Sequence, residues 1–424
     1  MPRDRSRTPE PRTAPVTLRE VAAEAGVHTG TASRALNDST RGFVNAATAE
    51  RVMRAAARLG YRPNSIARGL KTNRSYIVGV VVPDLRNPLF PPIARGIEER
   101  LEPGGYTALL ANTDNDPEHE RTSFEALQAR QVDGYITATA RRDHPLLREI
   151  ARGWPLVLVN RVVDGHDISA VVADDRDGMR QAVEHLRELG HTRIAHVGGS
   201  AEISTGTERL GGYEDAMAAA GLPVDPALVA IGGMYAEAEG ARMTRQLLGA
   251  GVRFTAIAAG NDLIALGAID ALREAGLRVP EDVSVVGFND MAWSERFSPP
   301  LTTVRVPHHE LGMEAGSLLL ERLANPSAPS REIVLPVRLI VRGSTAPVPV
   351  ARVSGARASA ARAARRSTAR AARRARAARS TPAANGASAA RAAAPTGARS
   401  ARAAARPVRR TSGSRRRNPA AGTP

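Results

Sequence analysis

The stretch VTLREVAAEAGVHTGTASRAL, residues 16–36, contains the signals of two short helices on either side of a glycine. Thr17 and Glu20 form a capping box, in which each side chain accepts a hydrogen bond from the backbone N–H of the other residue at a helix start. Gly26 supplies the left-handed position that ends a helix and turns the chain. The sequence therefore predicts one helix from the capping box to this glycine and a second helix over residues 29–36.

The second predicted helix has a small, polar outer surface. Its alanines can pack against the first helix, which leaves three hydroxyls and one guanidinium facing outward, on Thr29, Thr31, Ser33 and Arg34. Side chains of this kind suit contacts with phosphates and base edges. Taken alone, the same residues would also fit an ordinary helical hairpin with a polar face.

The wider sequence resembles the head of LacI-family transcriptional regulators. The resemblance is carried by TLREVAAEAGVHTGTASRALN (17–37) and VNAATAERVMRAAARLGYRPNSIARGLKTNRSYIVGVVVPD (44–84), and it continues through most of the chain. It implies an all-α helix-turn-helix head and a periplasmic-binding-protein-like α/β core. It also implies a sequence-specific, DNA-binding regulator, expected to be a repressor, that is controlled by a small-molecule effector.

The head is predicted to span residues 16–60, and a hinge is predicted to follow over residues 61–74. Asn45 can cap a third helix in the head, and Asn64 can cap a hinge helix too short to be stable without a partner. In the family, hinge helices fold when two subunits meet on the operator. The resemblance places the leucine that wedges into the minor groove at Leu70, and such wedging kinks the duplex. From the residues alone, a flexible linker is the alternative.

The resemblance also assigns the residues that contact DNA. The base-reading positions fall on Thr29, Gly30 and Arg34, and positions that support phosphate contact and docking fall on Thr31, Ser33 and Asn37. The expected DNA-binding set is completed by the caps Thr17 and Asn64 and by Leu70. Gly30 departs from the family pattern because it has no side chain with which to read a base, and His28 occupies a cap position where the family usually has serine. The resemblance therefore does not define the operator preference at the positions that this pair normally reads.

Charge is distributed unevenly along the chain. The net charge is +16, but residues 351–424 contain 19 arginines and no acidic residue, so the rest of the chain is left with a charge of −3. Proline, glycine and dense like charge predict a disordered basic tail over residues 346–424. Arginines of this kind add sequence-independent affinity for phosphates. The alternative is a segment without a selected role, produced by reading a GC-rich gene past its natural stop.

The composition also bounds the class of protein. The chain has no cysteine, which excludes disulfides, zinc-finger sites and thiol nucleophiles. Residues 1–15 are predicted to be a disordered lead, since they lack the apolar core of a signal peptide, and no apolar run is long enough for a membrane span. A cytoplasmic protein without a membrane partner is expected. This argues against an exported sugar-binding transport component, which the core would otherwise resemble.

Residues 75–345 alternate between buried-strand and amphipathic-helix patterns. Such alternation predicts parallel sheets with helices on both faces, and the length favours two doubly wound subdomains with a ligand between them. The resemblance adds that the chain crosses between the subdomains more than once. The strand candidates are residues 76–82, 106–111, 133–138, 155–159, 193–198, 255–259 and 282–288.

Polar residues follow several of these strands, where ligands bind in open α/β sheets. By resemblance, Arg209, Asn261 and Asn289 match ligand-contacting positions, and Tyr235 matches an aromatic site that can stack on a sugar. Each residue alone could be a turn or capping residue, but their recurrence favours a ligand site. The full expected effector-binding set is Asp84, Asn87, Phe90, Asn160, Arg161, Arg209, Tyr235, Asn261, Asn289 and Asp290.

Nothing in the sequence indicates catalysis. His185, His191 and His196 lack the spacing of a metal site on one face, and no serine has the setting of a nucleophile. We therefore expect no enzyme activity, no metal and no cofactor. The expected partners are double-stranded operator DNA, a small-molecule effector that is a sugar by family precedent, and a second copy in a homodimer. An architectural DNA-binding protein that uses its tail and has no effector is the alternative.

Overall fold

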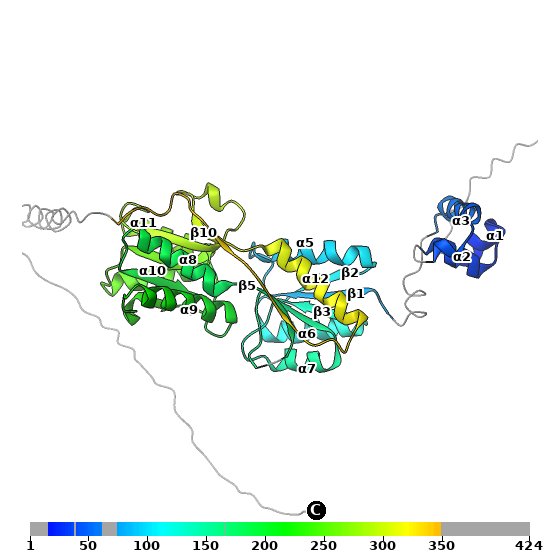
Figure 1. Cartoon of the computed structure of the whole chain (residues 1–424), viewed down its shortest axis with the longest axis horizontal. Coiled ribbons are helices and arrows are strands. Elements are labelled where there is room, and N and C mark those ends of the chain that lie inside the picture. The colour runs from blue at the N-terminus through cyan, green and yellow to red at the C-terminus, as the bar shows by residue number, and fades with distance from the viewer. Residues whose placement is uncertain (1–15, 38–39, 62–73, 166, 349–424) are drawn as a thin grey trace, which may run out of the picture. The chain divides into compact units, whose positions relative to one another are not determined.

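A computed structural model describes residues 16–37, 40–61, 74–165 and 167–348. Within these ranges the chain forms a helical head and two α/β subdomains (Figure 1). The expectations for residues 1–15, for Asn64 and Leu70 in the hinge, and for the tail beyond residue 348 lie outside the described residues.

The head contains three helices around a small core of valine and alanine side chains. The predicted capping box is present, with the Glu20 N–H donating to Thr17 Oγ1 and the Thr17 N–H donating to the Glu20 carboxylate. Gly26 has a φ of 62°, the left-handed conformation expected of a residue that ends a helix. The predicted helices are confirmed as α1 (Leu18–Glu24), α2 (Thr29–Leu36) and α3 (Ala46–Leu59), with the single turn η1 (Arg41–Phe43) before α3.

The first subdomain is built on a six-stranded parallel sheet in the order β11-β5-β4-β3-β1-β2. Its strands are β1 (Ile77–Val82), β2 (Thr107–Asn112), β3 (Gly134–Thr137), β4 (Leu156–Val159), β5 (Ser169–Ala173) and β11 (Glu332–Leu335). Its helices are α5 (Phe90–Leu101), α6 (Pro117–Ala129), α7 (Pro145–Gly153) and α12 (His308–Ala324), with the turn η2 (Glu102–Gly104) after α5. Helices α5 and α12 pack closely because Gly96 and Gly312 lie where a Cβ would collide with the other helix's backbone.

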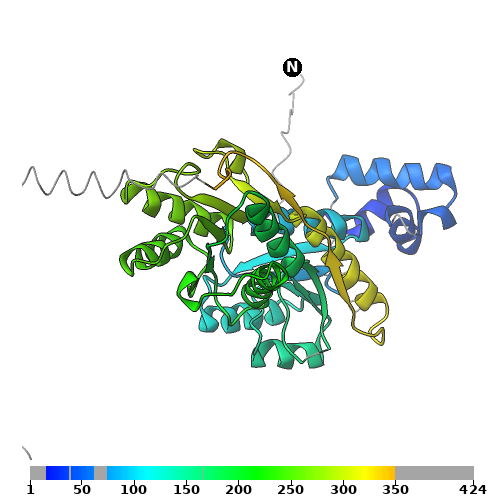
Figure 2. The same cartoon turned by 60° about the vertical axis from the view of Figure 1, so that its left-hand side comes forward.

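The second subdomain also has a six-stranded sheet, in the order β12-β10-β9-β8-β6-β7. Its strands are β6 (Ile194–Gly198), β7 (Val229–Ile231), β8 (Ala256–Ala259), β9 (Ser284–Asn289), β10 (Thr302–Arg305) and β12 (Arg338–Ile340). Its helices, green in Figure 2, are α8 (Asp175–Glu188), α9 (Ser204–Ala219), α10 (Glu237–Gly249) and α11 (Asp262–Glu274), with the turns η3 (Pro226–Leu228) and η4 (Ser294–Arg296). All pairings are parallel except that of β12 with β10.

The chain crosses between the two sheets three times: from β5 to α8, from β10 to α12, and from β11 to β12. The predicted fold class, a helical head with a core of two α/β subdomains, is confirmed. Hydrogen bonds to the core continue past residue 345, because the Ala346 carbonyl accepts from His191 and the Val348 N–H donates to Leu189. No helix among the described residues is long and apolar enough to span a membrane.

Candidate functional site

Helix α2 presents the predicted DNA-contacting surface of the head. Ala32 and Ala35 are fully buried against the other helices, whereas Arg34 is exposed and its Nε donates to the Gly30 carbonyl at 3.3 Å. His28 caps the helix, since its Nδ1 accepts from the Gly30 N–H at 3.1 Å. The departure from the usual serine thus keeps a capping acceptor but adds a bulky ring beside Gly30.

The other predicted DNA contacts are arranged around this helix. Those on α2 are partly buried, and those at the two ends of the helix-turn-helix are exposed. Thr29, Thr31 and Ser33 belong to the first group, and Thr17 and Asn37 belong to the second. Thr17 is also engaged in the capping box, which limits its side chain as a contact for DNA.

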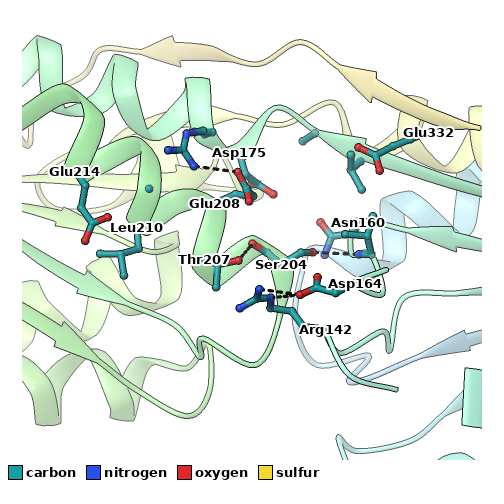
Figure 3. A pocket seen from close by; sticks show the side chains of 15 residues that line it. Arg142, Asn160, Asp164, Asp175, Ser204, Thr207, Glu208, Leu210, Glu214 and Glu332 are labelled. Atoms are coloured by element: carbon teal, nitrogen blue, oxygen red, sulfur yellow. Dashed lines mark hydrogen bonds and ion pairs between the residues drawn. The ribbon is translucent and has the colours of Figure 1, made fainter. Parts of the chain in front are cut away.

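Two cavities lie between the subdomains. The larger cavity has a volume of about 640 Å³ and is lined by residues that follow the ends of β1, β3, β4, β6 and β7. Five predicted effector-binding residues line it: Asp84, Asn87, Phe90, Arg161 and Tyr235. The smaller cavity, of about 400 Å³, is lined by Asn160 instead (Figure 3). The structure thus divides the adjacent pair Asn160 and Arg161 between two different cavities.

Among the predicted effector-binding residues, Arg209 makes the largest set of hydrogen bonds and ring contacts. It is 4% exposed, and its guanidinium donates to Asp175 Oδ1 at 2.8 Å, to the Gly260 carbonyl at 2.7 Å and to Asn289 Oδ1 at 3.5 Å. It also lies over the Phe288 ring, at 3.9 Å from the ring centroid. Burial acts to lower the pKa of Arg209, but the Asp175 carboxylate and other neighbours hold it above its ordinary value. Arg209 therefore remains charged in the interior.

Several buried polar atoms in this region have no hydrogen-bond partner among the described residues. They are Arg161 Nε, Tyr235 Oη, Asn261 Nδ2 and His308 Nε2. Tyr235 lies between the cavity and Arg209, whose guanidinium carbon is 5.5 Å from the ring centroid. Burial lowers the pKa of Arg161 to about 10. Leaving such groups unpaired costs about 1–3 kcal/mol each, which a ligand with matching acceptors and donors would recover.

Asp290 is placed differently from the other predicted residues. Its carboxylate pairs with Arg305 Nε at 2.6 Å and with Arg342 Nη2 at 2.7 Å, so it joins β10 to the segment after β12. It lines neither cavity, and neither do the predicted residues Arg209, Asn261 and Asn289. Asn289 has a φ of 111° and turns its side chain toward Arg209.

Two residues near the cavities were not anticipated from the sequence. Glu120, on α6, is 3% exposed, accepts from Thr139 and His144, and lines the larger cavity. Its surroundings in PEHERTSFEALQ are those of a solvated helix, so no pattern signalled its burial. His308 lies at the start of α12, far along the chain from the strand ends that guided the prediction.

Comparison with known proteins decides the family. Residues 17–64 match the profile described as "Bacterial regulatory proteins, lacI family", and residues 183–345 match "Periplasmic binding protein-like domain". The HTH-type transcriptional repressor CytR of Escherichia coli (strain K12) is 35% identical over 334 residues, which are 78% of this chain and 97% of CytR. The chain belongs to the LacI family. It is accordingly a DNA-binding transcriptional regulator of the repressor type, as predicted.

Two solved structures extend the comparison of this LacI-family chain. The transcriptional regulator CelR in complex with cellobiose is 36% identical, with a TM-score of 0.60 over 78% of this chain and 99% of that chain. The lac repressor dimer bound to operator and the anti-inducer ONPF is 31% identical, with a TM-score of 0.69 over 78% of this chain and 100% of that chain. The relatives are regulators rather than enzymes.

The histidines of this LacI-family regulator occupy separate environments. His191 pairs with Thr255, Ser284 and the Ala346 carbonyl, and His185 pairs with Thr345. His196 is fully buried, its ring stacked on Tyr213 at a centroid distance of 5.2 Å. In the part of the chain that the structure describes, no three His, Cys, Asp or Glu side chains are grouped to hold a metal.

His196→Phe should make the regulator less sensitive to acid. Burial lowers the pKa of His196 from 6.5 to about 4, so the unfolded chain binds the proton more readily and the wild type loses stability as pH falls from 6.5 towards 4. Phenylalanine keeps the stacked ring and takes up no proton. Between pH 7 and pH 5 the free energy of unfolding should fall by about 2 kcal/mol less in the variant, measured by denaturant titration.

Asp262 does not confound this comparison, although burial raises its pKa to about 7 and gives its contribution the opposite slope. It is present in both proteins, so its effect cancels. If the free energy of unfolding changed with pH in the same way in the wild type and the variant, the acid sensitivity could not be assigned to His196.

Proposed function

We propose that a small, hydroxyl-bearing effector, a sugar or a related metabolite, binds in the larger cavity and alters the affinity of this regulator for its operator. The observation that carries the proposal is the two unpaired buried atoms on Arg161 and Tyr235, residues that both line the larger cavity. Hydroxyls both donate and accept hydrogen bonds, so one polyol can satisfy the guanidinium and the phenol together. No catalytic step is proposed, and the regulator is placed in the cytoplasm because its DNA target is there.

The relatives support an effector of this class. CelR has been crystallised with cellobiose, and the lac repressor has been crystallised with ONPF on its operator. Phe90 and Tyr235 add apolar ring surface to the cavity, which suits the C–H face of a sugar. Because the walls come from both subdomains, an occupant can favour one relative arrangement of the two. It changes operator affinity only by its differential affinity for those arrangements.

Arg161→Met should separate ligand binding from stability. Removal of a half-buried guanidinium whose Nε has no partner among the described residues should leave the free protein equally stable or more stable, because the cost of partly desolvating that charge is lost. The same change should abolish the rise in melting temperature that an effector produces. The measurement is a thermal-shift screen of sugars and nucleosides on the full chain, repeated on the variant with each hit.

Arg152→Met is the matched control, since it removes an exposed arginine from the same subdomain. The control should keep the full ligand-induced shift. A screen in which no sugar or nucleoside stabilises the wild type would contradict the effector proposal, and so would an Arg161→Met variant that retains the shift.

The regulator is also proposed to bind DNA as a homodimer, with one α2 helix on each half-site. The lac repressor structure is a dimer on its operator. In this chain Trp293 is 70% exposed and is held in a left-handed conformation with a φ of 71°. The left-handed backbone conformation is strained for a tryptophan, and the exposed ring is a large apolar surface. A strained residue that presents such a ring to solvent is typical of an anchor in a protein–protein interface.

Trp293→Ala should weaken the dimer. Loss of a tryptophan anchor costs about 2 kcal/mol or more, which raises the dissociation constant about 30-fold. Analytical ultracentrifugation over a range of concentrations measures this constant. Phe43→Ala, which removes a ring that is 82% exposed on the head, is the control and should leave the constant unchanged. Equal effects of the two changes would argue against Trp293 as the anchor.

A further inference from the structure

The smaller cavity is a separate space between the subdomains. It shares no lining residue with the larger cavity. The first subdomain contributes Asn160, Asp164 and Glu332, and the second contributes Glu208 and Glu214 from α9 (Figure 3). An occupant of this cavity would contact both subdomains without entering the effector position.

The walls of the smaller cavity are acidic. Five carboxylates line it against two guanidiniums: Asp164, Asp175, Glu208, Glu214 and Glu332 against Arg142 and Arg176. Three of the five carboxylates are already paired, Asp164 with Arg142 at 2.7 Å, Asp175 with Arg209 at 2.7 Å and Glu208 with Arg176 at 3.5 Å. Arg176 also pairs with Asp215 at 2.7 Å. Glu214 and Glu332 come from opposite subdomains, and neither has an ion-pair partner among the described residues. The surplus of negative charge in this cavity therefore rests on Glu214 and Glu332, which are both exposed residues at its edge.

Asn160 gives an independent indication of a ligand. It is 4% exposed and has a φ of 69°, a left-handed conformation that directs its side chain into the smaller cavity (Figure 3). Its backbone N–H donates to the Val171 carbonyl. Its side-chain amide makes no hydrogen bond within the described ranges, and it is not among the fully buried unpaired atoms, so it faces the open space of the cavity. The carbonyl oxygen of this amide is therefore available to a donor that enters the cavity.

We propose that the smaller cavity binds an organic polycation, a diamine or a longer polyamine. Ammonium groups are hydrogen-bond donors only, which matches the Asn160 carbonyl oxygen and the free carboxylates. A metal ion fits less well, because nowhere in the described part of the chain are three ligating side chains close enough to share one. Spaced charges on a flexible chain can instead reach carboxylates that lie apart.

The position of Asp175 links this site to the effector region. Asp175 lines the smaller cavity, and its carboxylate holds Arg209, which contacts Asn289 and lies beside Tyr235. A cation beside Asp175 competes for the charge that orients Arg209. Polyamine binding is therefore expected to change the affinity for an effector in the larger cavity, and the two bindings are reciprocal.

The test is isothermal titration calorimetry of the full chain with spermidine. An ionic strength of about 0.15 M is used, because salt at this concentration screens non-specific electrostatic attraction to the protein surface. One saturable site per chain is expected. The double variant Glu214→Gln/Glu332→Gln should weaken binding at least tenfold. The matched control Glu125→Gln/Glu188→Gln removes the same charge from exposed positions on α6 and α8, one in each subdomain, and should bind as the wild type does.

Asn160→Gly keeps the left-handed backbone and removes the amide, so it provides a second variant that does not depend on charge. It should also weaken spermidine binding, by several-fold. Equal weakening in the two double variants would show general surface attraction and overturn the proposal. Absence of saturable binding to the wild type, or magnesium ions competing as well as spermidine does, would overturn it too.

Discussion

Arg209→Met should lower the free energy of unfolding by about 3–5 kcal/mol at pH 7, the largest effect expected of any single substitution in this regulator. The change removes the buried partner of Asp175, which is 5% exposed and accepts from Arg209 at 2.7 Å. An uncompensated carboxylate then remains in the interior, and the bonds to the Gly260 carbonyl and Asn289 are lost as well. Denaturant unfolding monitored by circular dichroism gives the measurement.

The double variant Arg209→Met/Asp175→Asn should recover much of this loss, because it removes the unpaired charge. Burial already raises the pKa of Asp175, so the single variant should also be less destabilised at low pH, where this carboxylate takes up a proton. If the double variant were no more stable than Arg209→Met alone, the ion pair would not be the source of the loss. Both variants should fail to respond to an effector.

Arg34→Ala should reduce affinity for the operator about 10- to 100-fold, because a bidentate base contact contributes about 1–3 kcal/mol of discrimination. Arg34 is the one long side chain on the outer surface of α2, since Gly30 has none. The operator is first obtained by selecting DNA that binds the wild type from a random pool. Affinities for this site and for scrambled DNA are then measured by fluorescence anisotropy.

Arg54→Ala provides the control for charge alone, since it removes an exposed arginine from α3 that pairs with Glu50 at 3.6 Å. This variant should lose a little affinity for both DNAs equally. Arg34→Ala should lose affinity mainly for the selected site. It should also bind selected sites with a different base at one position as tightly as the original site. A uniform loss on both DNAs would mean that Arg34 contacts phosphate rather than a base.

Much of the head could be predicted because its signals are local. A capping box, a left-handed glycine and a capping asparagine each act within a few residues, and the three helices begin where these signals place them. The same reasoning found seven strands of the core, whose continuous apolar runs are typical of strands buried on both faces.

Five strands were not predicted, and one of them, β5, is a buried apolar run that was missed although its local pattern is strong. The other four have weaker local patterns. β7 and β12 are three residues long, and half of the four-residue strand β10 is threonine. β11 alternates between exposed and half-buried side chains at the edge of the first sheet, far along the chain from its neighbour β5. Their strand conformation depends on pairing with strands that are distant in the sequence, and such pairing cannot be predicted from a local sequence pattern.

The sequence by itself determined the helix-turn-helix, the α/β class of the core and the family, because helix caps, hydrophobic periods and motif spacing are local properties of the chain. Only the tertiary structure decided which polar strand-end residues meet. It placed Arg161 and Tyr235 on the larger cavity, Asn160 on the smaller one, and Asp290 in ion pairs with Arg305 and Arg342. Adjacent residues at a strand end point in different directions, so proximity in the chain does not determine which site each one serves.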